Sequence, residues 1–205
     1  SYSVYLNNSF LPGLLQLMIL LVTVFSIGSE MKRATSREWL RTADDSIIIA
    51  ITGKLIPQTI IFFSMGLLYL SLLYGYLHFP MHNSIWHMIF AMFLLVVASQ
   101  SFAVIIMCFA PSLRIGLSVG GLVGVLSLSI AGFSFPVPAM YLPFQAISYV
   151  LPVRHYFLIY VDQALNGIPL YYSRVHYVAL ILFAVASTPL LPRLKKALMR
   201  QVYVP

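Results

Sequence analysis

Charged residues are scarce in this sequence. Only 8% of the 205 residues are Asp, Glu, Lys or Arg, and 60% are hydrophobic, whereas soluble domains carry about 25% charged residues. A soluble chain of this length could not cover its surface with so few charges, so lipid must solvate much of it. No charged residue lies in the middle of a long apolar run. This argues against ion-coupled pumping, which needs ionisable groups inside the bilayer.

Several chemical motifs are absent as well. Cys108 is the single cysteine, so the chain can form no internal disulfide, and its apolar neighbours predict a small core residue. No Walker-type glycine-rich loop is present, which excludes ATP binding by that route. Of the five histidines, only His78 and His82 are four residues apart. Pro80 between them predicts a loop, so we expect no metal site there and find no catalytic constellation elsewhere.

Five apolar stretches are long enough to cross a bilayer, which requires about 20 helical residues. They cover approximately residues 11–27, 55–77, 85–110, 115–135 and 175–191. Unpaired backbone groups are costly in hydrocarbon, so these stretches should be helices. A β-barrel would require alternation with a period of two, and residues 92–97 show none. The sequence therefore predicts an all-α fold, a polytopic membrane bundle of about five helices.

Lysine and arginine predict the orientation of this bundle. Five spans would place ten of the twelve cations on one side: Lys32, Arg33, Arg37, Arg41, Lys54, Arg114, Arg193, Lys195, Lys196 and Arg200. Arg154 and Arg174 fall on the other side with one acid, Asp162, which we expect to pair with an arginine. Because basic loops stay in the cytoplasm, the N-terminus should face outward and the C-terminus inward. Cations confined to short loops disfavour a nucleic-acid partner.

The loop of residues 28–46 is the most informative segment, because it mixes four of the five acids with four cations. Thr35 and Glu38 have the spacing of a capping box, which predicts a short helix that starts at Ser36 and carries Trp39. Such a helix could dock on a soluble partner or rest at the lipid headgroups. The mixed charge favours a protein partner, since anionic lipid would favour uniform positive charge.

Polar residues at and inside the spans predict anchoring and packing roles. Lys54 opens the second span before Pro57, and we expect it to anchor that span by extending its amine to the headgroups. Gln16, Gln58 and Gln100 lie within spans. Each is expected to hydrogen-bond to a neighbouring helix rather than to bind a substrate.

Three glycines recur every fourth residue in the fourth span: Gly116, Gly120 and Gly124. They share one helix face and allow close approach of another helix. Two interpretations remain, which are tight packing within one subunit and a surface that slides during conformational change.

Prolines interrupt the chain after the fourth span, and three within eight residues forbid a continuing helix. The apolar pieces that follow are too short to span, and they predict re-entrant or interfacial helices on the outer side. Broken helices at membrane depth are tolerated where they line a cavity or pack on protein. Residues 133–166 are therefore a candidate outer gate. Its marker residues are Phe135, Pro136, Pro138, Pro143 and Pro152.

These segments resemble, in order, the permease subunits of type-2 ABC exporters, particularly bacterial multidrug and efflux-type members. Residues 8–13 look like the start of the family's second span, residues 30–40 like its ATPase-docking loop, residues 53–57 like the start of its third span, and residues 132–152 like its outer gate. The resemblance covers nearly the whole sequence. One departure is that the family's usual Gly-Thr pair is Ala34-Thr35 here.

The resemblance implies that two such subunits, identical or different, form a translocation path beneath which ABC ATPase subunits dock. ATP and magnesium would be held by the ATPase, so this chain would carry no cofactor and no catalytic site. It would lie in the bacterial inner membrane and export hydrophobic or amphipathic, drug- or lipid-like cargo, with a periplasmic adaptor protein as a further partner. Coupling to the ATPase is expected at Glu30, Arg33, Thr35, Arg37, Glu38 and Trp39.

Members of that family normally begin with another span and a large extracytoplasmic domain. Neither is present, which fits a sequence limited to the C-terminal membrane region of a six-span protein. Two other functions remain open. A membrane enzyme that modifies lipids would need polar groups clustered at one interface, for which the outer histidines are the candidates. A membrane anchor or scaffold for motility or secretion machinery would not co-purify with an ATPase.

Overall fold

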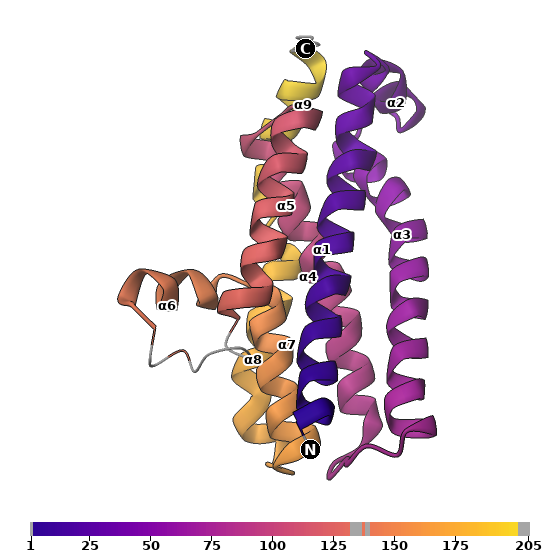
Figure 1. Cartoon of the computed structure of the whole chain (residues 1–205). Helices are drawn as coiled ribbons and strands as arrows, with labels where there is room; N and C mark the ends of the chain where they lie inside the picture. The colour runs from indigo at the N-terminus through magenta and orange to yellow at the C-terminus, as the bar shows by residue number, and fades with distance from the viewer. Residues whose placement is uncertain (1, 132–136, 138–139, 201–205) are drawn as a thin grey trace.

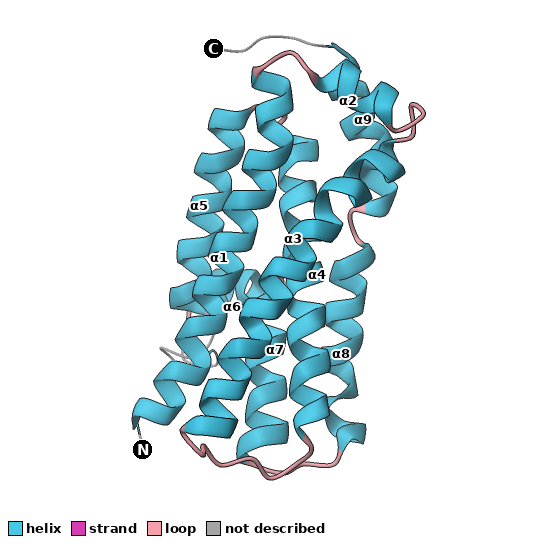
Figure 2. Cartoon of the chain, turned by 90° about the vertical axis from the view of Figure 1, so that its right-hand side faces the viewer, coloured by secondary structure: helices cyan, strands magenta, loops and turns pink. Residues whose placement is uncertain are grey.

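The computed structural model describes residues 2–131, 137 and 140–200, with side chains from residue 10 onward. The predicted all-α fold is confirmed, because the described ranges contain helices and no strand (Figure 2). The long helices are α1 (Tyr2–Lys32), α3 (Ile47–Leu70), α4 (Ile85–Phe109), α5 (Leu113–Ile130) and α8 (Leu170–Val185). The short helices are α2 (Ser36–Thr42), α6 (Leu142–Tyr149), α7 (Pro152–Tyr160) and α9 (Leu191–Arg200).

The predicted number of membrane spans is also found. Within the described residues, five helical segments are long and apolar enough to cross a membrane: Phe10–Lys32, Ile47–Tyr76, Ile85–Phe109, Leu113–Ile130 and Leu170–Arg200. The second begins eight residues before the predicted position 55, because the side chain of Ser46 caps the helix by accepting from the backbone N–H of Ile49. The last is interrupted by a 3₁₀ turn at Thr188–Leu190 before α9.

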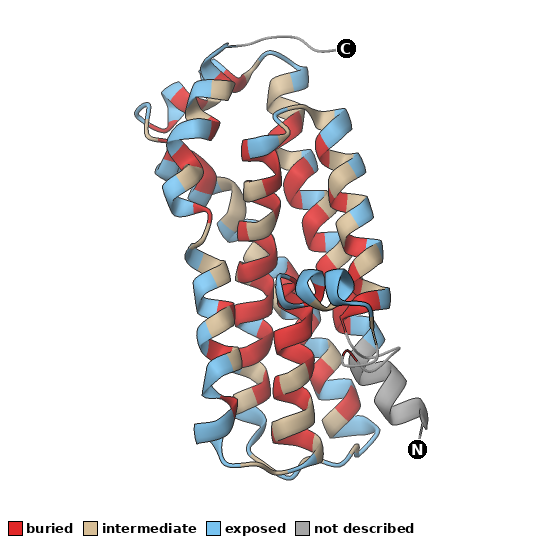
Figure 3. Ribbon diagram, turned by 90° about the vertical axis from the view of Figure 1, so that its left-hand side faces the viewer, coloured by how far each residue is buried: buried red, intermediate tan, exposed pale blue. Residues whose placement is uncertain are grey.

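Helix α4 forms the centre of the bundle and packs against α1, α3, α7 and α8 (Figure 1). Its residues are apolar on all sides, as expected of a helix surrounded by other helices. Met88, Met92, Leu95 and Ala98 are fully buried. The buried residues of the whole molecule follow the same axis, while the outward faces stay exposed (Figure 3). Cys108 is 2% exposed, which confirms it as a core residue.

The glycines of the fourth span lie where α5 packs closely on α1. A Cβ atom built on Gly124 would lie 2.2 Å from Cδ1 of Leu17, and one on Gly116 would lie 2.9 Å from Cγ1 of Val24. Gly120 is buried on the same face. The structure thus places these residues in a tight contact between two helices of the same subunit.

The glutamines bridge helices, as predicted. The amide nitrogen of Gln16 donates to Oγ of Ser127 at 2.9 Å, and its amide oxygen accepts from the backbone N–H of Val153 at 2.8 Å. One buried side chain therefore connects α1, α5 and α7. Gln58 and Gln100 each accept a hydrogen bond from a threonine of a neighbouring helix.

Replacing Gln16 with leucine is expected to destabilise the bundle by about 2 kcal/mol, because it leaves the buried backbone N–H of Val153 without an acceptor. Thermal unfolding in detergent micelles measures the effect. The matched control is Gln58→Leu, whose hydrogen bond joins only side chains at a partly buried position, and we expect a smaller loss there. Equal unfolding temperatures for Gln16→Leu and the unmodified protein would refute the bridging role.

The segment after the fourth span forms two different short helices. Helix α6 stands off the side of the bundle about midway along its length, and Tyr141, which precedes it, is 83% exposed (Figures 1 and 3). Helix α7 instead packs against α8 and α4, and all but one of its residues are buried. The interfacial interpretation is therefore wrong for α7, which is internal to the bundle. Pro143 and Pro152 lie in the first turns of α6 and α7. Phe135, Pro136 and Pro138 lie outside the described residues.

The outer charges also differ from expectation. Asp162 pairs with no arginine in the described ranges, and its carboxylate accepts from the Ser173 hydroxyl at 3.0 Å. Arg154 is only 7% exposed, because α7 carries it into the bundle. Its guanidinium carbon lies 4.4 Å from the ring centroid of Tyr149. Arg154 thus stacks on an aromatic ring, and the expected outer salt bridge is absent.

Candidate functional site

Helices α2 and α9 meet at one end of the bundle, which we call the basic end because it carries most of the cations (Figures 1 and 2). They share an apolar cluster in which Leu40 of α2 and Leu194 and Leu198 of α9 are fully buried. Two hydrogen bonds to backbone carbonyls add to this contact. Arg37 donates to the carbonyl of Met199 at 3.1 Å, and Lys195 donates to that of Asp45 at 2.5 Å. Helix α9 therefore packs against the buried side of α2 and holds it in place.

Helix α2 starts at Ser36, as predicted, but the capping box is wrong. Thr35 has no side-chain hydrogen bond to the backbone of α2. Its hydroxyl donates instead to the carboxylate of Glu30 on α1. The bond to Glu30 uses the hydroxyl proton, whereas capping would use the hydroxyl oxygen as an acceptor. Capping fails because the backbone of Thr35 (φ −92°, ψ 1°) is not in the extended conformation that turns the oxygen toward the helix N–H groups. The result is a side-chain bond that connects α2 to the end of α1.

The turn between α1 and α2 explains the Ala34-Thr35 pair. Ala34 has φ = 59°, which is the left-handed region that favours glycine. The backbone N–H of Thr35 bonds to the carbonyl of Glu30 at 3.0 Å and closes the end of α1. Glycine adopts this backbone freely, whereas alanine costs about 1 kcal/mol there.

Lys54 joins three helices at the basic end. Its Nζ atom lies 2.6 Å from Oε1 of Glu30 and 2.8 Å from the carbonyl oxygen of Ser26, both on α1. It also lies 4.5 Å from the ring centroid of Trp39 on α2. The expectation that Lys54 extends to the headgroups is wrong, since the amine turns inward to Glu30. This is the one ion pair in the part of the chain that the structure describes.

The coupling residues predicted from sequence divide into two groups. Glu30, Thr35 and Trp39 lie together around Lys54 and connect α1, α2 and α3. Arg33, Arg37 and Glu38 are exposed. The inward group can transmit a displacement of α2 to the long helices. The outward group, with Arg41, is accessible to a protein that approaches the basic end.

A comparison with protein-family models identifies the family of this chain. A model described as "ABC-2 family transporter protein" matches residues 1–191. The chain belongs to the ABC-2 transporter family. No curated protein and no solved structure matches it in the corresponding comparisons. The permease is thus a multi-pass membrane component of an ABC transporter, and its family implies association with ABC ATPase subunits and dimerisation.

The sequence did not reveal two parts of this site. Lys54 lies 24 residues from Glu30, so no local spacing connects them. Helix α9 was assigned only as a basic tail after the last span, although its apolar positions at 191, 194 and 198 follow helical periodicity. That periodicity is the signal that could have predicted a packed amphipathic helix.

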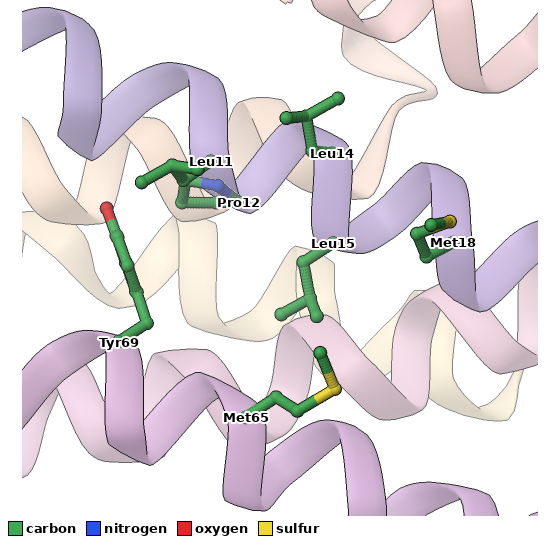
Figure 4. Close-up of a pocket in the computed structure, with 7 residues that line it drawn as sticks. All are labelled: Leu11, Pro12, Leu14, Leu15, Met18, Met65 and Tyr69. Atoms are coloured by element: carbon green, nitrogen blue, oxygen red, sulfur yellow. The ribbon is translucent and has the colours of Figure 1, made fainter.

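The half of the permease away from the basic end contains an apolar cavity of about 230 Å³ between α1 and α3 (Figure 4). Its walls are formed by Leu11, Pro12, Leu14, Leu15, Met18, Met65 and Tyr69. The lining carries no charged side chain, so the cavity suits an apolar group rather than an ion.

The histidines do not gather at one position, although His155 and His176 are neighbours. His78 and His82 bond through Nδ1 to different backbone carbonyls, those of Tyr76 and Ala164. His155 bonds to the carbonyl of Tyr149 and approaches His176 on α8, with 3.4 Å between their Nδ1 atoms. Within the described ranges, no three His, Cys, Asp or Glu side chains gather as metal ligands.

Proposed function

We propose that the permease couples ATP hydrolysis on a separate ABC ATPase to the export of hydrophobic or amphipathic cargo across the bacterial inner membrane. In this proposal the basic end lies in the cytoplasm, as the distribution of lysine and arginine favours. The observation that carries the proposal is the contact of Lys54 with Glu30 and Trp39. It links a short exposed helix to two long apolar ones.

The proposed coupling runs through this contact. Closure of the ATPases, which hold ATP and magnesium, displaces α2. Lys54 and Glu30 pass the displacement to α3 and α1 because their ion pair is only partly exposed and is reinforced by the bond from Lys54 to the Ser26 carbonyl. Helix α5 follows α1, since the glycine contact leaves little space between them. The outer segment from α6 to α7 then opens as the gate.

The proposed cargo class rests on what lines the permease. The cavity between α1 and α3 is apolar and large enough for part of a drug- or lipid-like molecule. The spans carry no central acid or lysine for an ion-coupled cycle, which supports ATP as the energy source. A second permease subunit would complete the path, and a periplasmic adaptor would receive the cargo.

The docking surface can be tested by reversing the charge of Glu38, which is exposed on α2. Glu38→Lys is expected to lower the affinity of the ATPase for the permease about tenfold or more, because a favourable contact becomes a like-charge contact. Co-purification and ATPase stimulation in nanodiscs measure the effect. The control is Lys196→Glu, a charge reversal on the exposed side of α9. Unchanged ATPase binding by Glu38→Lys would contradict docking at α2.

A further inference from the structure

A second cavity lies at the basic end, on the side where α1 and α5 meet. Its volume is about 230 Å³, and it is lined by Phe25, Ser29, Lys32, Arg33 and Leu113. It differs from the outer cavity because two cations and a hydroxyl stand beside apolar groups. None of these residues belongs to the Lys54 contact.

Among the described residues, neither cation of this cavity is directly paired with an acid. The nearest acid in sequence, Glu30, hydrogen-bonds to Lys54 and Thr35, and Arg33 acts on it only as a neighbouring charge. Lys32 and Arg33 take part in no ion pair in the described ranges. The lining therefore has a charge of +2 with no acid, and its charge complements that of an anion.

Polarity changes along the cavity in the direction of the bundle axis. Lys32 and Arg33 lie at the end of α1, and Phe25 lies two turns deeper, about 10 Å along the helix. Phe25 is 52% exposed on a segment apolar enough to span the membrane, so its exposed face is available to lipid chains. Ser29, between them, adds a polar group to the lining, although its hydroxyl donates to the carbonyl of Ser26 at 3.1 Å. A phospholipid has the same sequence of groups, with an anionic phosphate, an ester region and an acyl chain.

We infer that this cavity binds one anionic phospholipid of the adjacent leaflet. Lys32 and Arg33 hold the phosphate, and Phe25 and Leu113 contact the first part of an acyl chain. A free phosphate would leave the apolar half of the cavity empty. An acidic patch on the ATPase would have to enter the membrane to reach Phe25. The two-part lining therefore favours a lipid over either of them.

The inference is tested with the full-length protein in nanodiscs that contain phosphatidylglycerol and phosphatidylcholine. Native mass spectrometry counts the phosphatidylglycerol molecules that remain bound. Lys32→Gln is expected to weaken retention about fivefold, since one basic residue near a membrane surface contributes about that factor. The matched control Lys196→Gln removes an equally exposed cation from α9 and should retain the lipid.

Three results would overturn the inference. The first is equal retention by Lys32→Gln and Lys196→Gln, which would reduce Lys32 to a topology signal. The second is displacement of the lipid by millimolar inorganic phosphate, which would identify a simple anion site. The third is a loss of ATPase binding in Lys32→Gln with lipid retention unchanged, which would assign this face to the ATPase. Because ATPase binding is measured separately, failure here is distinguishable from failure of docking at α2.

Discussion

Replacing Lys54 with methionine is expected to lower ATP-driven transport by about tenfold or more. Methionine keeps much of the side-chain length but removes the charge that holds Glu30 and lies over Trp39. A charged hydrogen bond of this kind contributes about 1.5–3 kcal/mol. Its loss frees α2 to move without displacing α1 and α3. The ATPase should still bind, because Glu38 and Arg41 remain exposed.

The measurement compares efflux of an amphipathic fluorescent dye with the ATPase rate of the same complex in proteoliposomes. Lys54→Met should hydrolyse ATP without efflux, and Glu30→Gln should resemble it. The double variant should lose less than the sum of the two single losses, since both changes break the same ion pair. Lys196→Met serves as the control for loss of a cation at this end. Normal efflux by Lys54→Met would show that force reaches the spans by another route.

Replacing Gly124 with alanine is expected to destabilise the permease by about 1–3 kcal/mol, although alanine is the better helix former. The added methyl would lie 2.2 Å from Cδ1 of Leu17 and 3.2 Å from its Cα atom. A side-chain rotation can relieve the first contact, but the second involves the backbone. Helices α1 and α5 must therefore separate, and the bridge from Gln16 to Ser127 lengthens with them.

Thermal unfolding in detergent, with and without the ATPase, measures this effect. Gly121→Ala is the control on the same helix, because its new methyl would come no closer than 3.9 Å to another side chain. That variant should unfold at the same temperature as the unmodified protein or slightly higher. Restoration of stability by Leu17→Ala in the Gly124→Ala background would confirm the cause. A Gly124→Ala protein as stable as Gly121→Ala would show that the contact is not tight.

The sequence predicted the number of spans because apolar length is a local property. Each run of about 20 apolar residues identifies itself without reference to the rest of the chain. The boundaries were less accurate for the same reason. Lys54 set the start of the predicted second span at residue 55, since a charge next to an apolar run normally marks the membrane edge. In the structure its charge is compensated by a carboxylate of another helix, and this depends on tertiary contacts.

Helix α7 shows a second limit of prediction from sequence. Its length excluded a span and predicted a re-entrant or interfacial helix. The structure instead packs it among α1, α4 and α8, where Val153, Tyr156 and Ile159 are almost completely buried. Short helices carry too few residues for periodicity to reveal how many sides are covered. The packing of the neighbouring long helices decides it.

In the loop of residues 28–46 the predicted position was right and the predicted mechanism was wrong. Its short helix was located to the residue from Thr35 and Glu38, yet the mechanism behind that prediction was incorrect, because Thr35 bonds to Glu30 and not to its own helix. Both arrangements need a hydroxyl at position 35. The sequence could indicate that a helix begins there, but it could not indicate that the hydroxyl would donate to a carboxylate of α1 and not accept from its own helix.

Because α9 packs against α2, helix α2 can reach its final packing only after the C-terminal part of the permease has been synthesised. Arg37 leaves the ribosome 162 residues before Met199, the residue whose carbonyl it binds. At about 5–20 residues per second, α2 waits on the order of 10–30 s for that partner. Until then the apolar side of α2 that includes Leu40 lacks the cover that Leu194 and Leu198 provide. An unfinished or prematurely terminated polypeptide therefore lacks the apolar cover of α2, and under the proposed docking at α2 it should recruit the ATPase less well than a finished chain.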